Sequence, residues 1–316
     1  MSLRDETLRI WDTNYENIRP RLLAWIKAAA KQRKQLKEYS KEIKELDMGP
    51  LKLYASVGAS SALDIRFRGQ SIGTLKLNKG TPQITISKKN QKTNERDFNF
   101  KTAGIISHNR IKAIQKHLEN CLGEPRVTEH KYESLIIHEM MGSASGKLSG
   151  VFPDGIQPVT MGEFPLQVPL PISANEGYPV FNSGTGHIDI LARCKNKSEF
   201  APRLSVWELK RPGETQHAAQ QAYIYAVTLL KILRSDLGSQ WYQSVCDFAK
   251  ETKIENIKIP THLHIDVVVC VEERQKAVIA KEFKKLSNLK THGSDQLHFR
   301  IVTYREDLTF KLHNRE

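Results

Sequence analysis

Alternating apolar and polar positions predict two neighbouring strands in the middle of the chain. Apolar residues dominate GHIDILARC (186–194) and RLSVWELKRPG (203–213), and each run carries one acidic residue near its centre, Asp189 or Glu208. A Pro-Gly pair after the second run predicts a turn, and the apolar spacing over 215–235 predicts a helix beyond it. The pattern therefore predicts a strand–strand–helix unit in which each strand bears a carboxylate.

The second of these strands is expected to place its charged residues on one face. Side chains alternate along a strand, so Glu208 and Lys210 share one face while Trp207 and Leu209 share the other. Burying a carboxylate and an ammonium group in an apolar strand is costly unless other charges neutralise them. A divalent metal ion does this, and the oxygen atoms of Asp189 and Glu208 suit Mg²⁺ or Mn²⁺. The alternative is a surface strand whose exposed Glu-Lys pair contributes little.

Hydrophobic periodicity and the positions of Gly and Pro predict the elements around this unit. Residues 4–47 are expected to be helical, with Pro20 marking a break or the start of a second helix. Further helices are expected over 108–123 and 129–142, strands over 51–57, 62–69, 71–78, 82–89, 162–173, 261–273 and 299–306, a loop or hairpin over 175–186, and a mobile basic loop over 87–99. The prolines of 162–173 suggest an edge or irregular strand. A central mixed sheet flanked by helices gives an α/β fold class.

Charge divides the chain into two expected domains. The 316 residues carry a formal net charge of +13 and are 39% hydrophobic, which allows one large domain or two smaller ones. Residues 1–127 hold 25 Lys and Arg against 13 Asp and Glu, whereas residues 128–316 hold 23 against 22. We therefore expect a basic N-terminal region of helices and a β-meander over 1–127 that grips a polyanion. A basic surface that only favours solubility is the alternative.

A Glu-x-Lys spacing has little meaning by itself in this chain. It occurs five times, beginning at Glu42, Glu129, Glu208, Glu251 and Glu282. Only Glu208 stands in an apolar strand that follows another acid-bearing strand and precedes a Pro-Gly turn and a helix. That combination, rather than the three-residue motif, carries the prediction.

The combination resembles the PD-(D/E)XK nuclease superfamily, which includes restriction endonucleases, Holliday-junction resolvases and recombination exonucleases. The resemblance covers roughly residues 128–275, and Ile188 stands where the superfamily name has proline. The matching positions are Asp189 for the first acid, Glu208-Leu209-Lys210 for the ExK element, and Gln221 with Tyr225 for the QxxxY motif of some branches.

The resemblance implies a restriction endonuclease-like core over 128–316 and a metal-dependent deoxyribonuclease activity. Asp189, Glu208 and the backbone carbonyl of Leu209 would bind Mg²⁺ or Mn²⁺. Lys210 would orient or deprotonate the attacking water and stabilise developing negative charge. Gln221 and Tyr225, four residues apart on one helical face, would contact a metal-bound water, Lys210 or a phosphate. Tyr225 as a core aromatic, an exposed Gln221, and the neighbouring Gln220 in place of Gln221 are the alternatives.

Many members of the superfamily carry a further acid on the helix before the first core strand. In this chain that helix is expected over 129–142, and it offers both Glu133 and Glu139. Glu133 lies near the helix start, which is the usual placement, and is therefore preferred. Either residue can also be a solvated surface acid.

The expected partner is nucleic acid, double-stranded DNA in the first instance. A homodimer or a partner protein is compatible with the sequence, and without a GxxxxGK[ST] loop any NTP-driven step would need another chain. Endonuclease or exonuclease action, DNA or RNA, and a non-cleaving binding protein all stay open. No apolar run approaches about 18 residues, and the N-terminus lacks a signal-peptide core, so a cytoplasmic protein is expected.

Overall fold

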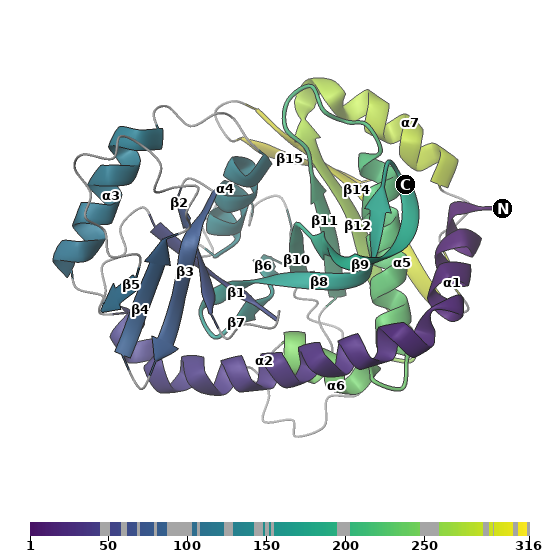
Figure 1. Cartoon of the computed structure of the whole chain (residues 1–316). Helices are drawn as coiled ribbons and strands as arrows, with labels where there is room; N and C mark the ends of the chain where they lie inside the picture. The colour runs from purple at the N-terminus through teal and green to yellow at the C-terminus, as the bar shows by residue number, and fades with distance from the viewer. Residues whose placement is uncertain are drawn as a thin grey trace.

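The structure is a computed structural model that forms a mixed α/β fold with two mixed sheets and helices packed against them (Figure 1). The α/β class predicted from the sequence is confirmed. No helix in the described part of the chain combines the length and apolar character needed to cross a membrane. The described residues are 1–44, 51–57, 62–67, 70–78, 81–86, 103–105, 108–122, 129–141, 148, 152, 155–194, 203–246, 259–286, 291–292, 294–305 and 309–314.

The first sheet joins the N-terminal meander to strands from the second half of the chain. Its described strands lie in the order β5-β4-β3-β2-β1-β8-β7, with β9 paired to β8. Strands β1 and β8 run parallel, with Ala55 opposite Leu166, and the other neighbours are antiparallel. The strands are β1 (Leu51–Ser56), β2 (Leu63–Phe67), β3 (Gln70–Asn78), β4 (Thr81–Ile86), β5 (Ala103–Ile105), β7 (Thr160–Met161), β8 (Phe164–Asn175) and β9 (Tyr178–Ile188).

The second sheet carries the expected ExK strand in its interior. Its described strands lie in the order β13-β14-β12-β11-β10-β6, with β15 paired to β14. The pairs β11–β12 and β12–β14 are parallel, and the other neighbours are antiparallel. The strands are β6 (Ile156–Pro158), β10 (Ile190–Cys194), β11 (Arg203–Leu209), β12 (His264–Glu272), β13 (Thr291–His292), β14 (Asp295–Tyr304) and β15 (Phe310–Asn314).

The two sheets meet where the chain passes from one to the other. Strand β9 ends at Ile188 and β10 begins at Ile190, so Asp189 stands at the junction. The chain crosses between the sheets a second time at Val159, between β6 and β7. The Val159 N–H donates to the Leu191 carbonyl at 2.7 Å, so this crossing lies beside the first. The register shift in β8 near Leu170, next to Pro171, agrees with the irregular strand expected there. The hairpin expected over 175–186 is a tight turn at Glu176–Gly177 followed by β9.

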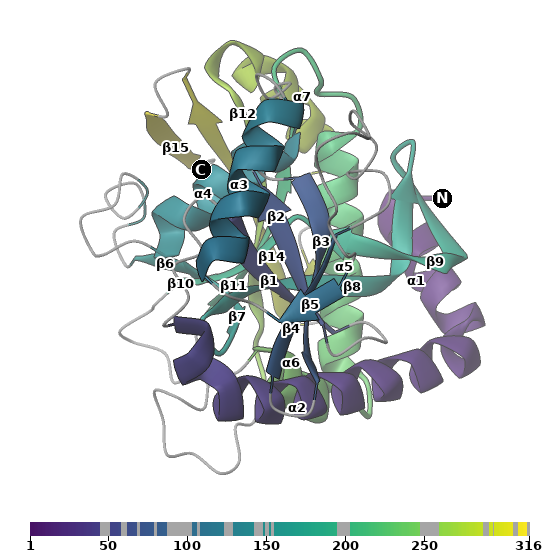
Figure 2. The same ribbon diagram turned by 60° about the vertical axis from the view of Figure 1, so that its left-hand side comes forward.

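Helices cover both faces of the second sheet. Helix α5 is buried along most of its length and packs on the face that carries Leu204 and Val206. Helix α4 packs on the opposite face with Trp207 and Leu209. The turned view shows α3 in front of the meander and α2 passing beneath both sheets (Figure 2). The helices are α1 (Leu3–Thr13), α2 (Tyr15–Lys44), α3 (His108–Leu122), α4 (Glu129–Met141), α5 (Ala218–Arg234), α6 (Gly238–Cys246) and α7 (Lys276–Leu286), with a 3₁₀ turn at Glu273–Gln275.

The helix break expected at Pro20 lies instead at Asn14. The side-chain amide of Asn14 donates to the Ile10 carbonyl at 2.8 Å, and its own carbonyl accepts from Ile18 at 3.0 Å, so one residue ends α1 and starts α2. Pro20 lies inside α2. A proline there removes one backbone hydrogen bond, and the burial of Ile18 and Leu22 on either side holds the helix together.

Candidate active site

Asp189 is held at the sheet junction by the strand that carries the other two motif residues. Its Oδ2 accepts a hydrogen bond from the Leu209 N–H at 2.8 Å. Ile190 is paired with Trp207, so one step further in the antiparallel register brings Asp189 opposite Glu208. The two predicted acids therefore lie at neighbouring positions of adjacent strands.

Glu208 and Lys210 point to the same face, as their spacing in β11 predicts. The Lys210 ammonium nitrogen lies 2.6 Å from Glu208 Oε1, and Glu208 is only 4% exposed. The backbone of Lys210 is fixed on both sides, because its N–H donates to the Cys270 carbonyl at 3.1 Å and its own carbonyl accepts from the Tyr304 hydroxyl at 2.8 Å. This ion pair is therefore buried and positioned by three strands.

Helix α5 brings Tyr225 close to these charges. Burial raises the pKa of the Tyr225 hydroxyl, and the Glu208 and Asp189 carboxylates raise it further, while Lys210 opposes them. The phenol therefore stays protonated at neutral pH. The Tyr225 side chain is buried, which agrees with a core aromatic residue. It also lies close enough to all three motif residues for their charges to shift its pKa.

Gln221 and Gln220 point in different directions from α5. Gln220 donates to Glu282 Oε2 on α7 at 2.9 Å, away from the motif residues. The side-chain oxygen of Gln221 is buried and makes no hydrogen bond in the described part of the chain. A buried amide oxygen without a donor is costly, so Gln221 can accept a hydrogen bond from a bound water or substrate.

Glu133 of α4 is buried and forms an ion pair with Arg66 of the meander strand β2. Its Oε1 lies 2.9 Å from Arg66 Nη1, and the Arg66 guanidinium stacks over the Tyr54 ring at 4.1 Å. Helix α4 reaches the end of β11 through Tyr132, whose ring packs at a tilt against that of Tyr304 with centroids 4.5 Å apart. Glu139, the alternative acid, is half-buried further along α4. A role for Glu133 in the site stays a prediction.

Hard oxygen atoms are the metal ligands that this site can offer. Two carboxylates and one ammonium group meet here, so the sum of these three charges is negative. The available donors are the carboxylates of Asp189 and Glu208 and the Leu209 carbonyl, which suit Mg²⁺ or Mn²⁺. No group of three His, Cys, Asp or Glu side chains with metal-binding geometry occurs within the described ranges. A cation would therefore use these two carboxylates together with backbone, water or phosphate oxygen atoms.

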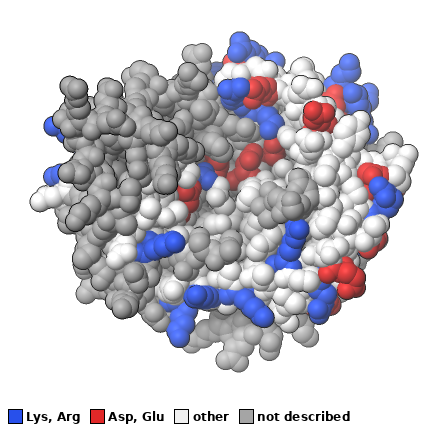
Figure 3. All heavy atoms as spheres, in the orientation of Figure 1, with Lys and Arg blue, Asp and Glu red and all other residues white. Residues whose placement is uncertain are grey.

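On the face shown in Figure 3, acidic side chains lie in the middle and basic side chains lie along the lower edge. Asp and Glu side chains gather in the hollow at its middle, over the region where Figure 1 places β10 and β11. Lys and Arg side chains follow the lower edge, along α2. The face thus combines an acidic centre with a basic lower edge, while acidic and basic side chains are mixed along the right edge.

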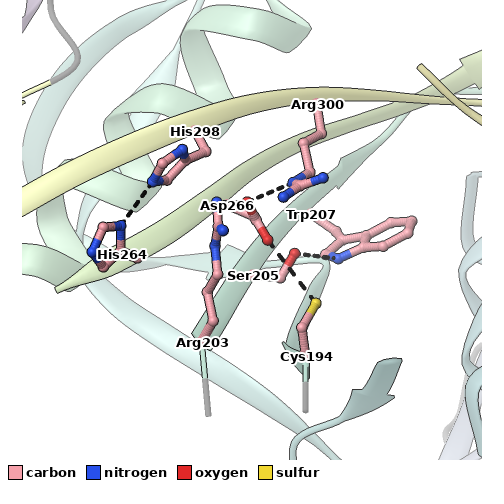
Figure 4. A network of polar contacts seen from close by, with 8 residues as sticks. All are labelled: Cys194, Arg203, Ser205, Trp207, His264, Asp266, His298 and Arg300. Carbon is pink, nitrogen blue, oxygen red and sulfur yellow. Dashed lines mark hydrogen bonds and ion pairs between the residues drawn. The ribbon is translucent and has the colours of Figure 1, made fainter. Parts of the chain in front are cut away.

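A second buried carboxylate lies on the other face of the same sheet, and the sequence analysis did not single it out. Asp266 of β12 is 1% exposed, and its Oδ1 lies 2.5 Å from Arg203 Nη2 and 2.6 Å from Arg300 Nε (Figure 4). The Cys194 sulfur lies 4.0 Å from Oδ2. Burial raises the pKa of the Asp266 carboxyl, and both guanidinium groups oppose this rise. Here the protein itself supplies the counter-charges.

Two histidines lie beside this network on neighbouring strands. His264 Nδ1 and His298 Nε2 are 2.9 Å apart, and the rings stack with centroids 5.2 Å apart (Figure 4). His264, which alternates with His262 in the sequence, is therefore packed against another ring. The described cysteines Cys194 and Cys270 are buried and form no disulfide with described residues.

Comparison with protein-family models, with curated protein sequences and with solved structures gives no significant match for this chain. The resemblance to the PD-(D/E)XK superfamily therefore stays a prediction that rests on the motif residues. Sequence reasoning missed two contacts of the predicted site residues, the ion pair of Arg66 with Glu133 and the hydrogen bond from Tyr304 to the Lys210 carbonyl. Both contacts join distant parts of the chain, and no local pattern signals them.

Proposed function

We propose that this protein is a metal-dependent nuclease that hydrolyses DNA phosphodiester bonds through a restriction endonuclease-like core. One observation carries the proposal. The Lys210 ammonium lies 2.6 Å from the Glu208 carboxylate, and the N–H of the residue between them, Leu209, holds Asp189 at 2.8 Å. The three motif positions thus converge, although Asp189 comes from a different strand.

The order of elements supports the same reading of the fold. The acid-bearing helix α4 precedes β8, the Asp189 junction and the ExK strand β11 follow, and α5 then leads to β12, which lies parallel beside β11. The resemblance to the superfamily implies the same order along the chain: an acid-bearing helix, the strands with the motif acids, and then a helix. The α/β layering around β11 is compatible with it.

The roles follow from the chemistry of the groups. Asp189, Glu208 and the Leu209 carbonyl would hold Mg²⁺ or Mn²⁺, which when bound acidifies a water and stabilises charge on the phosphate. Lys210 orients the attacking water and stabilises negative charge that develops on the phosphate oxygen atoms. The Tyr225 hydroxyl supplies a donor beside these groups, and the buried Gln221 oxygen, one helical turn before it on α5, supplies an acceptor.

A basic row on α2 supports nucleic acid as the substrate. Residues 17–36 contain six Lys and Arg and no Asp or Glu. Lys27, Lys31 and Lys34 are exposed and make no ion pair with the described residues. At positions i, i+4 and i+7 they share one side of the helix over about 10 Å, a spacing suited to successive phosphates of a backbone.

The test is cleavage of linear, circular and single-stranded DNA with and without Mn²⁺. We expect the parent protein to cut only with metal, and Asp189→Asn, Glu208→Gln or Lys210→Met to lower the rate by at least ~10³-fold. Glu282→Gln is the matched control, because Glu282 begins a Glu-x-Lys motif on α7 and pairs with Lys285 at 2.8 Å. Cleavage at the parent rate in the Asp189 and Glu208 variants would refute the proposal.

A nucleic-acid-binding protein that does not cut is the second candidate. The exposed lysine row on α2 favours it as much as it favours a nuclease. It predicts an electrophoretic shift of DNA by the parent protein and no product with any divalent metal. A shift that persists in Glu208→Gln while cleavage disappears would select the nuclease.

A further inference from the structure

Lys210 stands at the point where the chain leaves the second sheet. Strand β11 ends at Leu209, and a mostly exposed turn over 211–214 follows Lys210. The Lys210 ammonium nitrogen nonetheless keeps a distance of 2.6 Å from Glu208 Oε1. The position of the ammonium group therefore depends on the contacts that hold the Lys210 backbone beyond the last residue of the strand.

A tyrosine from a strand that does not touch β11 supplies one of these contacts. Tyr304 lies on β14, and β12 separates β14 from β11 in the sheet. The Tyr304 hydroxyl reaches over β12 and donates to the Lys210 carbonyl at 2.8 Å. Tyr304 is only 2% exposed, so its end of the hydrogen bond is shielded from water, which strengthens such a bond.

Tyr304 approaches Lys210 from the face opposite to the reacting groups. It packs with Trp207 and Leu209 on the face that α4 covers. The side chains of Glu208 and Lys210 alternate with those two residues and therefore point to the other face. The phenol is thus placed to position Lys210 rather than to touch a substrate.

The Tyr304 ring is itself held by α4. The Tyr132 ring packs against it at 30°, with centroids 4.5 Å apart. The next residue of the helix, Glu133, is buried and pairs with Arg66 of β2 at 2.9 Å. The contacts therefore run without interruption from the meander, through α4, to the backbone of Lys210.

We propose that Tyr304 is a positioning residue of the candidate active site, whose hydroxyl holds the Lys210 backbone so that the ammonium faces Glu208 and the attacking water, and whose ring is set in place by Tyr132. This inference rests on the proposed function. Loss of the hydroxyl frees the carbonyl of Lys210 and lets the strand end move. A displacement of about 1 Å at a reacting group can lower a rate ~10²-fold.

The test compares Tyr304→Phe with the parent protein, since this change keeps the ring against Tyr132 and removes only the donor to Lys210. We expect the single-turnover cleavage rate at saturating Mn²⁺ and DNA to fall ~10–100-fold. DNA affinity, measured by fluorescence anisotropy without metal, and the Mn²⁺ concentration for half-maximal rate should stay within ~2-fold, because no metal ligand and no basic side chain is altered. The melting temperature should fall by ~2–5 °C, and assays well below it compare folded proteins.

Two controls separate positioning from packing. Tyr223→Phe removes the hydroxyl of another buried tyrosine, whose ring stacks on Phe299 of the same strand β14, and it should cut at the parent rate. Tyr132→Leu removes the ring that packs against Tyr304 and should slow cleavage ~3–10-fold, whereas the conservative change Tyr132→Phe keeps the ring and should restore the parent rate.

Parental cleavage by Tyr304→Phe would overturn the inference, while cleavage by the parent upholds the nuclease. So would a loss that matches a lower folded fraction, a loss shared by Tyr223→Phe, or a loss that weaker DNA or Mn²⁺ binding accounts for. Equal rates in Tyr132→Leu and Tyr132→Phe would overturn the part assigned to the Tyr132 ring. A parent protein that does not cut DNA would overturn both the inference and the proposed function.

Discussion

Two buried clusters of charge occupy opposite faces of the second sheet, and they are balanced in opposite ways. On the α5 face, Asp189 and Glu208 meet one ammonium group, that of Lys210. On the other face, Asp266 lies between two guanidinium groups, those of Arg203 and Arg300. The first cluster sums to one negative charge and the second to one positive charge.

The difference teaches how a carboxylate in an apolar strand should be interpreted. Glu208 and Asp266 have the same kind of sequence environment, an acid within a run of Val, Leu, Ile and Trp. Asp266 accepts from two arginines, which compensate its desolvation inside the protein. The Asp189–Glu208 pair has one ammonium group beside it, and the proposed cation would add positive charge through the carboxylate oxygen atoms. We therefore expect the Asp266 cluster to serve stability, and the Asp189–Glu208 cluster to serve the proposed chemistry.

The largest effect that separates the two clusters is on folding stability. Asp266→Ala leaves the Arg203 and Arg300 side chains without their shared carboxylate, and we expect a loss of about 3–5 kcal/mol in the free energy of unfolding. Glu208→Gln keeps an acceptor for Lys210 and should cost less than about 1 kcal/mol. Urea denaturation followed by tryptophan fluorescence measures both. Equal losses would mean that both clusters serve mainly to stabilise the fold.

The second-largest expected difference between the clusters is the stability that each gains from a divalent cation. With Mg²⁺ or Mn²⁺ at 100 times its dissociation constant, binding to the native state alone adds about 2.7 kcal/mol to stability. We expect this gain in the parent protein and in Asp266→Asn, and its loss in Asp189→Asn. Thermal denaturation with and without the metal gives the readout. A full response in Asp189→Asn would show that the cation binds elsewhere.

The smallest effect tests how far the influence of the acidic cluster extends along α5. Tyr225→Phe removes a hydroxyl whose pKa is raised by burial and, further, by Glu208 and Asp189, and we expect cleavage to slow ~10-fold with little change in folding. Tyr223→Phe is the control, because Tyr223 is fully buried on the same helix and stacks on Phe299. Single-turnover rates of the two variants should differ. Equal rates would confine the site to the strands.

Local patterns predicted the parts of this molecule that depend on neighbours in sequence. The alternation in β11 placed Glu208 and Lys210 on one face, and the 2.6 Å ion pair confirms it. The Gly-punctuated meander and the helices α3, α4 and α5 were predicted within a few residues. The helix break was misplaced at Pro20, because the amide of Asn14 ends α1 through a side-chain hydrogen bond that composition does not reveal.

Contacts between distant residues were not predictable from one sequence. Arg203 and Arg300 lie 63 and 34 positions from Asp266, and Arg66 lies 67 positions from Glu133. No periodicity relates such pairs, so the acid paired with arginines and the acids of the candidate site look alike until the sheet order is known. The sequence identified the acids of the candidate site, and the fold determines which carboxylates are already compensated.

The parallel pairing of β1 with β8 limits how this chain can be divided or recombined. A fragment that starts at residue 128 would lack β1 and leave one side of β8 with open backbone groups, an invitation to self-association. It would also lose the packing of α1 against α5. Chimeras should therefore exchange the meander and the core together as one cooperative unit, and truncations should keep both.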